Sequence, residues 1–151
     1  LDIVTGSGVG ATPTVAIFDS ANNFKYVNGF FAYAPGFTSG IYISAADVDG
    51  NGIADIITGA GQGGPPNVVL FDSKGENPRS FYAYDSTFHG GVDVGSSQPV
   101  GSGLKSDILT ASGPGAPGTV AIFSKVMLGD YNPELVFKTG ADFSQNGIWV
   151  A

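Results

Sequence analysis

The sequence predicts an all-β protein built from about three four-stranded antiparallel repeats, the arrangement of blades in a β-propeller. First, the chain repeats itself: the segment that begins at Asp2 returns at Asp55 and again at Asp107. Second, each copy holds short apolar segments rich in β-branched and aromatic residues, separated by Gly, Pro, Asn and Asp, which is the pattern of an antiparallel sheet. Repeats of this length with four strands are typical of propeller blades.

The composition agrees with strands and turns. The 151 residues include 24 glycines and 9 prolines, which oppose long helices. There is no cysteine, so packing and ions must hold the fold. Thirteen acidic residues against six basic ones give a net charge of −7 without a Lys/Arg cluster, which argues against nucleic acid or an anionic membrane as a partner. No apolar run approaches the length of a membrane span.

The copies divide the single domain into repeat 1 at 1–53, repeat 2 at 54–105 and repeat 3 at 106–151. The pattern predicts one complete four-stranded unit. Its strands are expected near 40–46, 54–59, 67–72 and 79–84.

A second complete unit is expected from about 91 to 138. The beginning of the chain supplies three further strands, expected near 1–5, 14–18 and 26–33. Ile56 and Ile57 place apolar side chains on both faces of one strand, as expected for a sheet that lies between two others.

The two ends of the chain predict an incomplete propeller. Residues 147–151 read as the first strand of a further unit, whereas the first unit lacks its first strand. Three blades are fewer than the usual four to eight, so the ring is not expected to close within one chain. We expect a segment of a longer propeller; the alternative is assembly with other copies through strands near 1–5 and 147–151.

One loop carries the clearest chemistry. Oxygen-bearing side chains occur at alternating positions and then at the ninth position: they belong to Asp47, Asp49, Asn51 and Asp55. Ile53 would add a backbone carbonyl. Oxygen ligands of mixed type suit Ca²⁺, which accepts six to eight of them, better than zinc, which takes nitrogen or sulfur.

An EF-hand and an ordinary turn without metal are the alternatives to a calcium loop in a hairpin. An EF-hand would have a bidentate Glu at the twelfth position, but Thr58 stands there and a strand-like run begins at Ile56, so the loop is expected within a β-hairpin. An ordinary Asp/Asn/Gly turn uses the same residue types. Three carboxylates within nine residues repel one another, however, and a turn needs only one or two of them.

The loop and the segments that follow it resemble the FG-GAP/VCBS-type repeats of β-propellers, including the propeller of integrin α-subunits. The resemblance rests on residues 47–55, on the segment 56–61 that follows them, and on the Val-Val-Leu-Phe-Asp segment that ends at Asp72. It implies that the loop joins the innermost strand of a blade to the second strand. It also implies calcium ligation by Asp47, Asp49, Asn51, Ile53 and Asp55.

The corresponding loop of the next repeat departs from this pattern. Residues 96–105 hold no carboxylate before Asp107, are one residue longer and include Lys105. We expect no calcium in that loop.

Taken together, these features predict an extracellular or cell-surface calcium-binding module with a structural or adhesive role. An enzyme is not expected, because there is no cysteine and the one histidine lacks a recognisable catalytic partner. Carbohydrate binding is the alternative: Tyr42, Tyr131 and Trp149 could stack on a sugar. Packing between blades is the expected role of Tyr42 and Trp149, since both lie in predicted strands. The differing residues Tyr42, Asp93 and Trp149 also argue against repeated sugar sites.

Overall fold

The structure is a computed structural model that describes residues 2–97, 105–124, 126–139 and 147–150. In these residues the strands form three antiparallel sheets, and the only helical elements are two short 3-10 turns. The predicted all-β class is therefore confirmed. No helix in the described part of the chain is long and apolar enough to cross a membrane.

Each sheet is formed by strands that follow one another along the chain. The first sheet contains β1 (Ile3–Gly6), β2 (Thr14–Asp19) and β3 (Lys25–Phe31). The second contains β4 (Ile41–Ala46), β5 (Asp55–Ala60), β6 (Asn67–Phe71) and β7 (Arg79–Tyr82). The third contains β8 (Val92–Ser96), β9 (Ile108–Ser112), β10 (Thr119–Phe123) and β11 (Leu135–Lys138). The 3-10 turns are η1 (Ser20–Asn22) and η2 (Val126–Leu128).

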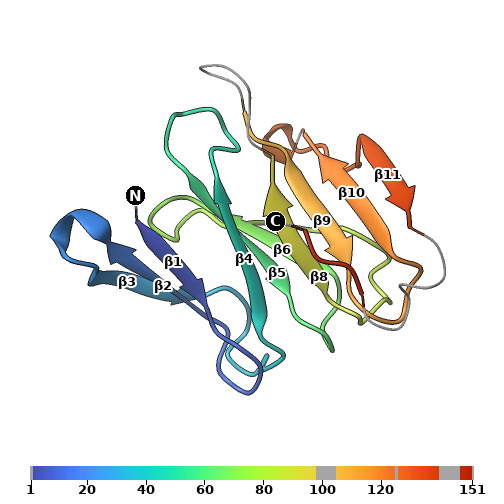
Figure 1. Ribbon diagram of the computed structural model, residues 1–151, viewed down its shortest axis with the longest axis horizontal. Coiled ribbons are helices and arrows are strands. Elements are labelled where there is room, and N and C mark those ends of the chain that lie inside the picture. Colours follow the sequence, from blue (N-terminus) through green and yellow to red (C-terminus); the bar gives the residue numbers. More distant parts are fainter. Residues whose placement is uncertain (1, 98–104, 125, 140–146, 151) are drawn as a thin grey trace.

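The three sheets lie side by side in chain order, with the first sheet at one end and the third at the other (Figure 1). One apolar cluster packs the first sheet against the second and includes Val15, Ile17 and Ile56. A larger cluster packs the second sheet against the third and includes Ile57 and Ile108. Neighbouring residues of β5 thus serve different clusters, which explains why this strand is buried along its whole length.

An aromatic contact is repeated at the two sheet interfaces. The rings of Phe30 and Phe71 have centroids 4.6 Å apart across the first interface. At the equivalent positions of the next interface, the rings of Phe81 and Phe123 have centroids 4.8 Å apart. Contacts of this kind add to the burial of apolar area. The repetition seen in the sequence therefore corresponds to a repetition of packing.

The observed strands agree closely with the predicted ones, apart from the segment at the end of the chain. Residues 147–150 are not in a strand, although Ile148 donates its N–H to the carbonyl of Ser112 at 3.1 Å. The equivalent strands β4 and β8 each pair with the next strand of their own sheet, β5 and β9. Within the described residues no such strand follows 147–150, so the segment lacks a ladder partner. Residue 151 lies outside the described residues.

The described strands form no closed ring. β1 is an edge strand of the first sheet, and residues 147–150 contact the third sheet instead of Ile3 and Val4. Most of the loop expected to lack calcium, residues 98–104, lies outside the described residues.

Candidate metal centre

The predicted metal loop joins β4 to β5. Ala46 and Asp55 are paired in the ladder and close the hairpin, and the loop leaves and returns at this point. Gly50 and Gly52 have φ angles of 81° and 86°. Residues with a side chain rarely adopt φ angles in this left-handed region, so the two glycines let the loop fold back on itself. The hairpin therefore holds the loop as the sequence predicts.

The fold brings three carboxylates together. An oxygen atom from each of Asp47, Asp49 and Asp55 lies within 4.8 Å of the other two. Asp55 is only 5% exposed, whereas the other two are half-buried. These three predicted site residues thus converge on one point, as metal ligation requires.

Backbone N–H groups surround the Asp47 carboxylate. Its Oδ1 accepts from Gly50 N at 2.6 Å and from Asn51 N at 3.0 Å, and its Oδ2 accepts from Gly52 N at 2.8 Å. Desolvation acts to raise the pKa of Asp47, but the bonds from Gly52, Gly50 and Asn51 together outweigh it and lower the pKa below its usual value. The loop thus favours the ionised form, which is the form that binds a cation.

The pKa of Asp55 is shifted in the opposite direction to that of Asp47. Burial raises the pKa of its carboxyl group, and the N–H of Val48, which donates to Oδ2 at 3.0 Å, only partly offsets that effect. The negative charges of Asp49 and Asp47 also raise it. This mutual repulsion is the electrostatic cost that a bound cation would relieve.

The other two predicted ligands lie at the rim of the loop. Asn51 donates its side-chain N–H to Asp49 Oδ2 at 2.9 Å and accepts the Ile53 N–H on Oδ1 at 2.7 Å. The Ile53 side chain is 58% exposed. Asn51 is therefore beside the cluster, and ligation through its amide oxygen or the Ile53 carbonyl stays a prediction.

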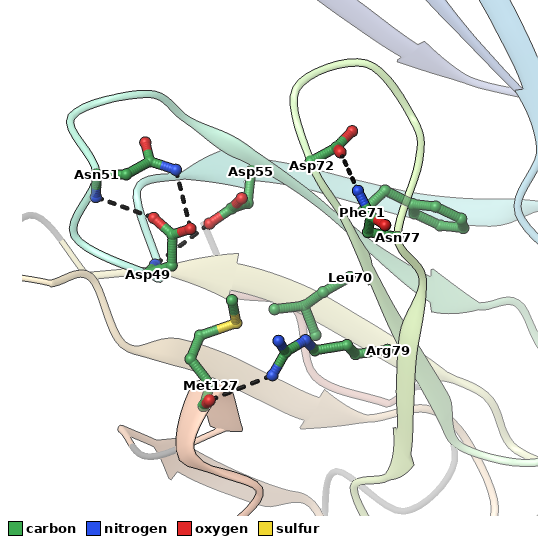
Figure 2. Close-up of a pocket in the computed structure, with 9 residues that line it drawn as sticks. All are labelled: Asp49, Asn51, Asp55, Leu70, Phe71, Asp72, Asn77, Arg79 and Met127. Atoms are coloured by element: carbon green, nitrogen blue, oxygen red, sulfur yellow. Dashed lines mark hydrogen bonds between the residues drawn. The ribbon is translucent and has the colours of Figure 1, made fainter.

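The loop opens onto a cavity of about 360 Å³. Figure 2 shows Asp49 and Asp55 on one side of this cavity, with Asp72 and Asn77 on the neighbouring turn and Arg79 below them. An ion held by the carboxylates could complete its coordination with water from such an opening.

Arg79 is committed to a different partner. Its guanidinium donates to the backbone carbonyl of Met127 at 3.2 Å, which ties the second sheet to η2 (Figure 2). The Arg79 side chain therefore contributes to the contact between the second and third sheets at the wall of this cavity.

Other aspartates in turns provide a comparison. Asp72 accepts three hydrogen bonds from its own turn, from Lys74 N, Glu76 N and the Asn77 side chain. Asp85 accepts from Thr87 N at 2.8 Å. Each of these turns is organised around one carboxylate, which is sufficient for the ordinary Asx geometry. The 47–55 loop differs because it gathers three.

Sequence reasoning missed the contact between this loop and the third repeat. Ser106 donates its backbone N–H to the carbonyl of Asp47 at 2.8 Å. A Cβ atom at Gly50 would lie 3.1 Å from Lys105 Cγ, so the lysine stem lies against the loop. Lys105 lies in the loop 96–105, which departs from the metal pattern, but nothing in the sequence placed it beside Gly50.

Comparison of the chain with models of protein families, with curated proteins and with solved structures gave no match.

Proposed function

We propose that this protein is a calcium-binding β-propeller repeat module, similar to FG-GAP/VCBS-type repeats, with a structural or adhesive role outside the cell or at its surface. The observation that carries the proposal is the convergence of the Asp47, Asp49 and Asp55 carboxylates within 4.8 Å. Carboxylates in a glycine-containing loop suit a hard cation with a flexible shell, which favours Ca²⁺ over Mg²⁺. Asn51 and the Ile53 carbonyl would supply further oxygens.

The stacking of the sheets supports the propeller part of the proposal. The first and second sheets pack face to face, and the same contacts are made again between the second and third sheets. A repeated interface of this kind can continue with further blades, from the same chain or from other copies. Partner blades are accordingly the proposed partners.

The ion would have a structural role because of where the loop lies. Asp47 belongs to the second sheet's hairpin, and its carbonyl accepts from Ser106, which leads into β9 of the third sheet. An ion that holds the loop in one conformation would also hold this contact between neighbouring repeats. Structural rigidity is the property that an adhesive module requires of its blades.

Calcium binding is tested by isothermal titration and by thermal unfolding with calcium or with EGTA. Extracellular calcium modules bind with a Kd on the order of 10⁻⁴ to 10⁻³ M. At a tenfold excess over Kd, the free energy of unfolding should rise by about 1.4 kcal/mol. For a domain of this size that corresponds to an increase in Tm of roughly 4 °C.

Asp49→Asn is the informative variant, and Asp85→Asn is its matched control. Both aspartates accept the N–H of the residue two positions later, at 2.9 Å from Asn51 and 2.8 Å from Thr87, and asparagine can keep that bond. Asp49→Asn removes one of the three negative charges and should clearly reduce the calcium-dependent shift in Tm, whereas Asp85→Asn should retain it in full. The proposal is contradicted if the unchanged protein shows neither a heat of calcium binding nor a calcium-dependent shift in Tm.

A further inference from the structure

A second cavity lies where the first strands of the second and third sheets meet the segment 147–150. Its volume is about 320 Å³, which falls at the lower end of the range for small-molecule sites. The residues whose side chains define its chemistry are Tyr42, Gln62, Asp93, Pro114 and Trp149. None of the calcium-loop residues lines it, so a site here is independent of the proposed function.

Three of the residues that line this cavity occupy the same position in successive repeats. Tyr42 in β4, Asp93 in β8 and Trp149 occupy equivalent places in three successive repeats. β4 and β8 lie in contact, and Val150 donates its N–H to Asp93 Oδ2 at 2.8 Å. In Figure 1 the final segment runs back beside β8 and β9. Three unlike side chains at equivalent positions therefore face a common space.

Asp93 gives the cavity a negative charge. The residue is only 8% exposed, and its carboxylate receives backbone N–H groups from Val150 and Val94. Among the described residues that line the cavity there is no Lys, Arg or His. Burial of a carboxylate is costly unless a positive group offsets the charge. A positively charged ligand would offset the charge of Asp93, which none of the described side chains that line the cavity does.

The two aromatic residues favour the same kind of ligand. Trp149 is 65% exposed, and Tyr42 is half-buried against the core of the second interface. Faces of Trp and Tyr rings attract cations, by about 0.5 kcal/mol at exposed sites and 2 kcal/mol or more where the cation is desolvated. Apolar substituents on such a cation would also cover the exposed indole.

We propose that this cavity binds a substituted ammonium group, in which Asp93 offsets the charge and Tyr42 and Trp149 contact the alkyl substituents. The net charge of −7 attracts cations toward the protein. A neutral sugar could also stack on Trp149, but it would leave the Asp93 charge without a positive partner. The charge of the ligand is therefore the property that separates the two classes.

The test uses choline as the probe. Trp149 is the only tryptophan, so the intrinsic tryptophan fluorescence of the protein reports on this cavity alone. Choline is titrated at constant calcium and ionic strength, beside 3,3-dimethylbutan-1-ol, which has the same shape without the charge, and a methyl glycoside. A saturable change with choline, at least about tenfold weaker with the neutral alcohol, is expected from the loss of a charged partner.

Two variants separate the role of Asp93 from general charge effects. Asp93→Asn should weaken choline binding by about tenfold or more, because it keeps an acceptor for Val150 and removes the charge. Asp2→Asn removes an exposed carboxylate outside the cavity and should leave the affinity unchanged. If Asp93→Asn fails to fold, the comparison of choline with the neutral alcohol still decides the question on the unchanged protein.

Three results would overturn the proposal. The first is no saturable fluorescence change with choline. The second is equal affinity for choline and the neutral alcohol, or equal choline affinity in the Asp93→Asn variant. The third is a response to the methyl glycoside without a response to choline, which would assign the cavity to carbohydrate instead.

Discussion

The hydroxyl group of Tyr84 joins the second sheet to the third through Thr110. Tyr84 Oη and Thr110 Oγ1 are 2.9 Å apart, and Tyr84 also donates to the carbonyl of Thr119 at 3.0 Å. The same arrangement occurs one repeat earlier, where Tyr33 donates to the carbonyl of Asn67 at 2.9 Å and Thr58 donates to Tyr33 Oη at 3.4 Å. Both threonines are completely buried. Each interface thus contains a polar contact whose members satisfy one another.

Removal of the Tyr84 hydroxyl should weaken the second interface. In Tyr84→Phe the carbonyl of Thr119 and the hydroxyl of Thr110 each lose a partner in a buried setting, at an expected cost of about 1 to 3 kcal/mol in the free energy of unfolding. Tyr82→Phe is the control, because Tyr82 is 53% exposed, and it should cost less than about 0.5 kcal/mol. Urea denaturation of the two variants measures the difference, and equal stabilities would contradict the assigned role of Tyr84.

The close approach of β5 to β8 depends on Gly59. A Cβ atom at this position would collide with the backbone carbonyl oxygen of Val92, which cannot move aside as a flexible side chain could. Gly59→Ala should therefore destabilise the protein by about 2 kcal/mol or more, or separate the second and third sheets.

Gly8→Ala is the control for this substitution, since a Cβ there meets nothing within 4 Å. Thermal unfolding should show a Tm near that of the unchanged protein for Gly8→Ala and a clear loss for Gly59→Ala. If Gly59→Ala keeps the original Tm, the two sheets do not approach as closely as the structure has them.

Asp93 should make stability depend on pH in an identifiable direction. Burial raises the pKa of its carboxyl group above the ordinary 3.8, against hydrogen bonds from Val150 and Val94 that lower it. Because the folded-state pKa is the higher one, the carboxyl group ionises less readily in the folded protein than in the unfolded chain. The stabilising contribution is fully present below pH 3.8 and is lost as the pH rises through the folded-state value.

The Asp93→Asn variant removes this titration. The free energy of unfolding of the unchanged protein, relative to Asp93→Asn, should therefore fall as the pH increases above 3.8. Tyr84 is the titratable neighbour that senses the Asp93 charge, and it stays neutral in this range because burial raises its own pKa well above 10. Denaturation at a series of pH values checks the trend, and parallel curves for the two proteins would contradict it.

Lys105 should reduce the calcium affinity of the neighbouring loop. Its stem lies against Gly50 of the loop that carries the three carboxylates. Lys105→Met keeps the apolar stem and removes the charge, so calcium affinity should increase about twofold at low salt and less at high salt, because exposed charges are screened.

Lys25→Met is the control for this charge effect, since Lys25 lies in β3 of the first sheet. Calcium titration at two ionic strengths compares the variants. Equal affinities of Lys105→Met and Lys25→Met at low salt would show that Lys105 has no electrostatic effect on the loop.

Features that depend on neighbouring residues along the chain could be predicted before the structure was known. Alternating and β-branched segments predicted the strands to within a few residues, because strand formation and turn chemistry are local. The loop 47–55 could be read for the same reason: its carboxylates are close in sequence, and Gly50 and Gly52 provide the backbone conformation that brings them together.

Which distant residues share a site became apparent only from the way the sheets pack in space. Tyr42, Asp93 and Trp149 occupy equivalent positions of the repeats but differ in chemistry, and only the stacking of β4, β8 and residues 147–150 places them around one cavity. The contact of Lys105 with Gly50 arises in the same way. The physical reason is that packing between sheets depends on how their faces meet in space, and the pattern within one strand does not specify that geometry.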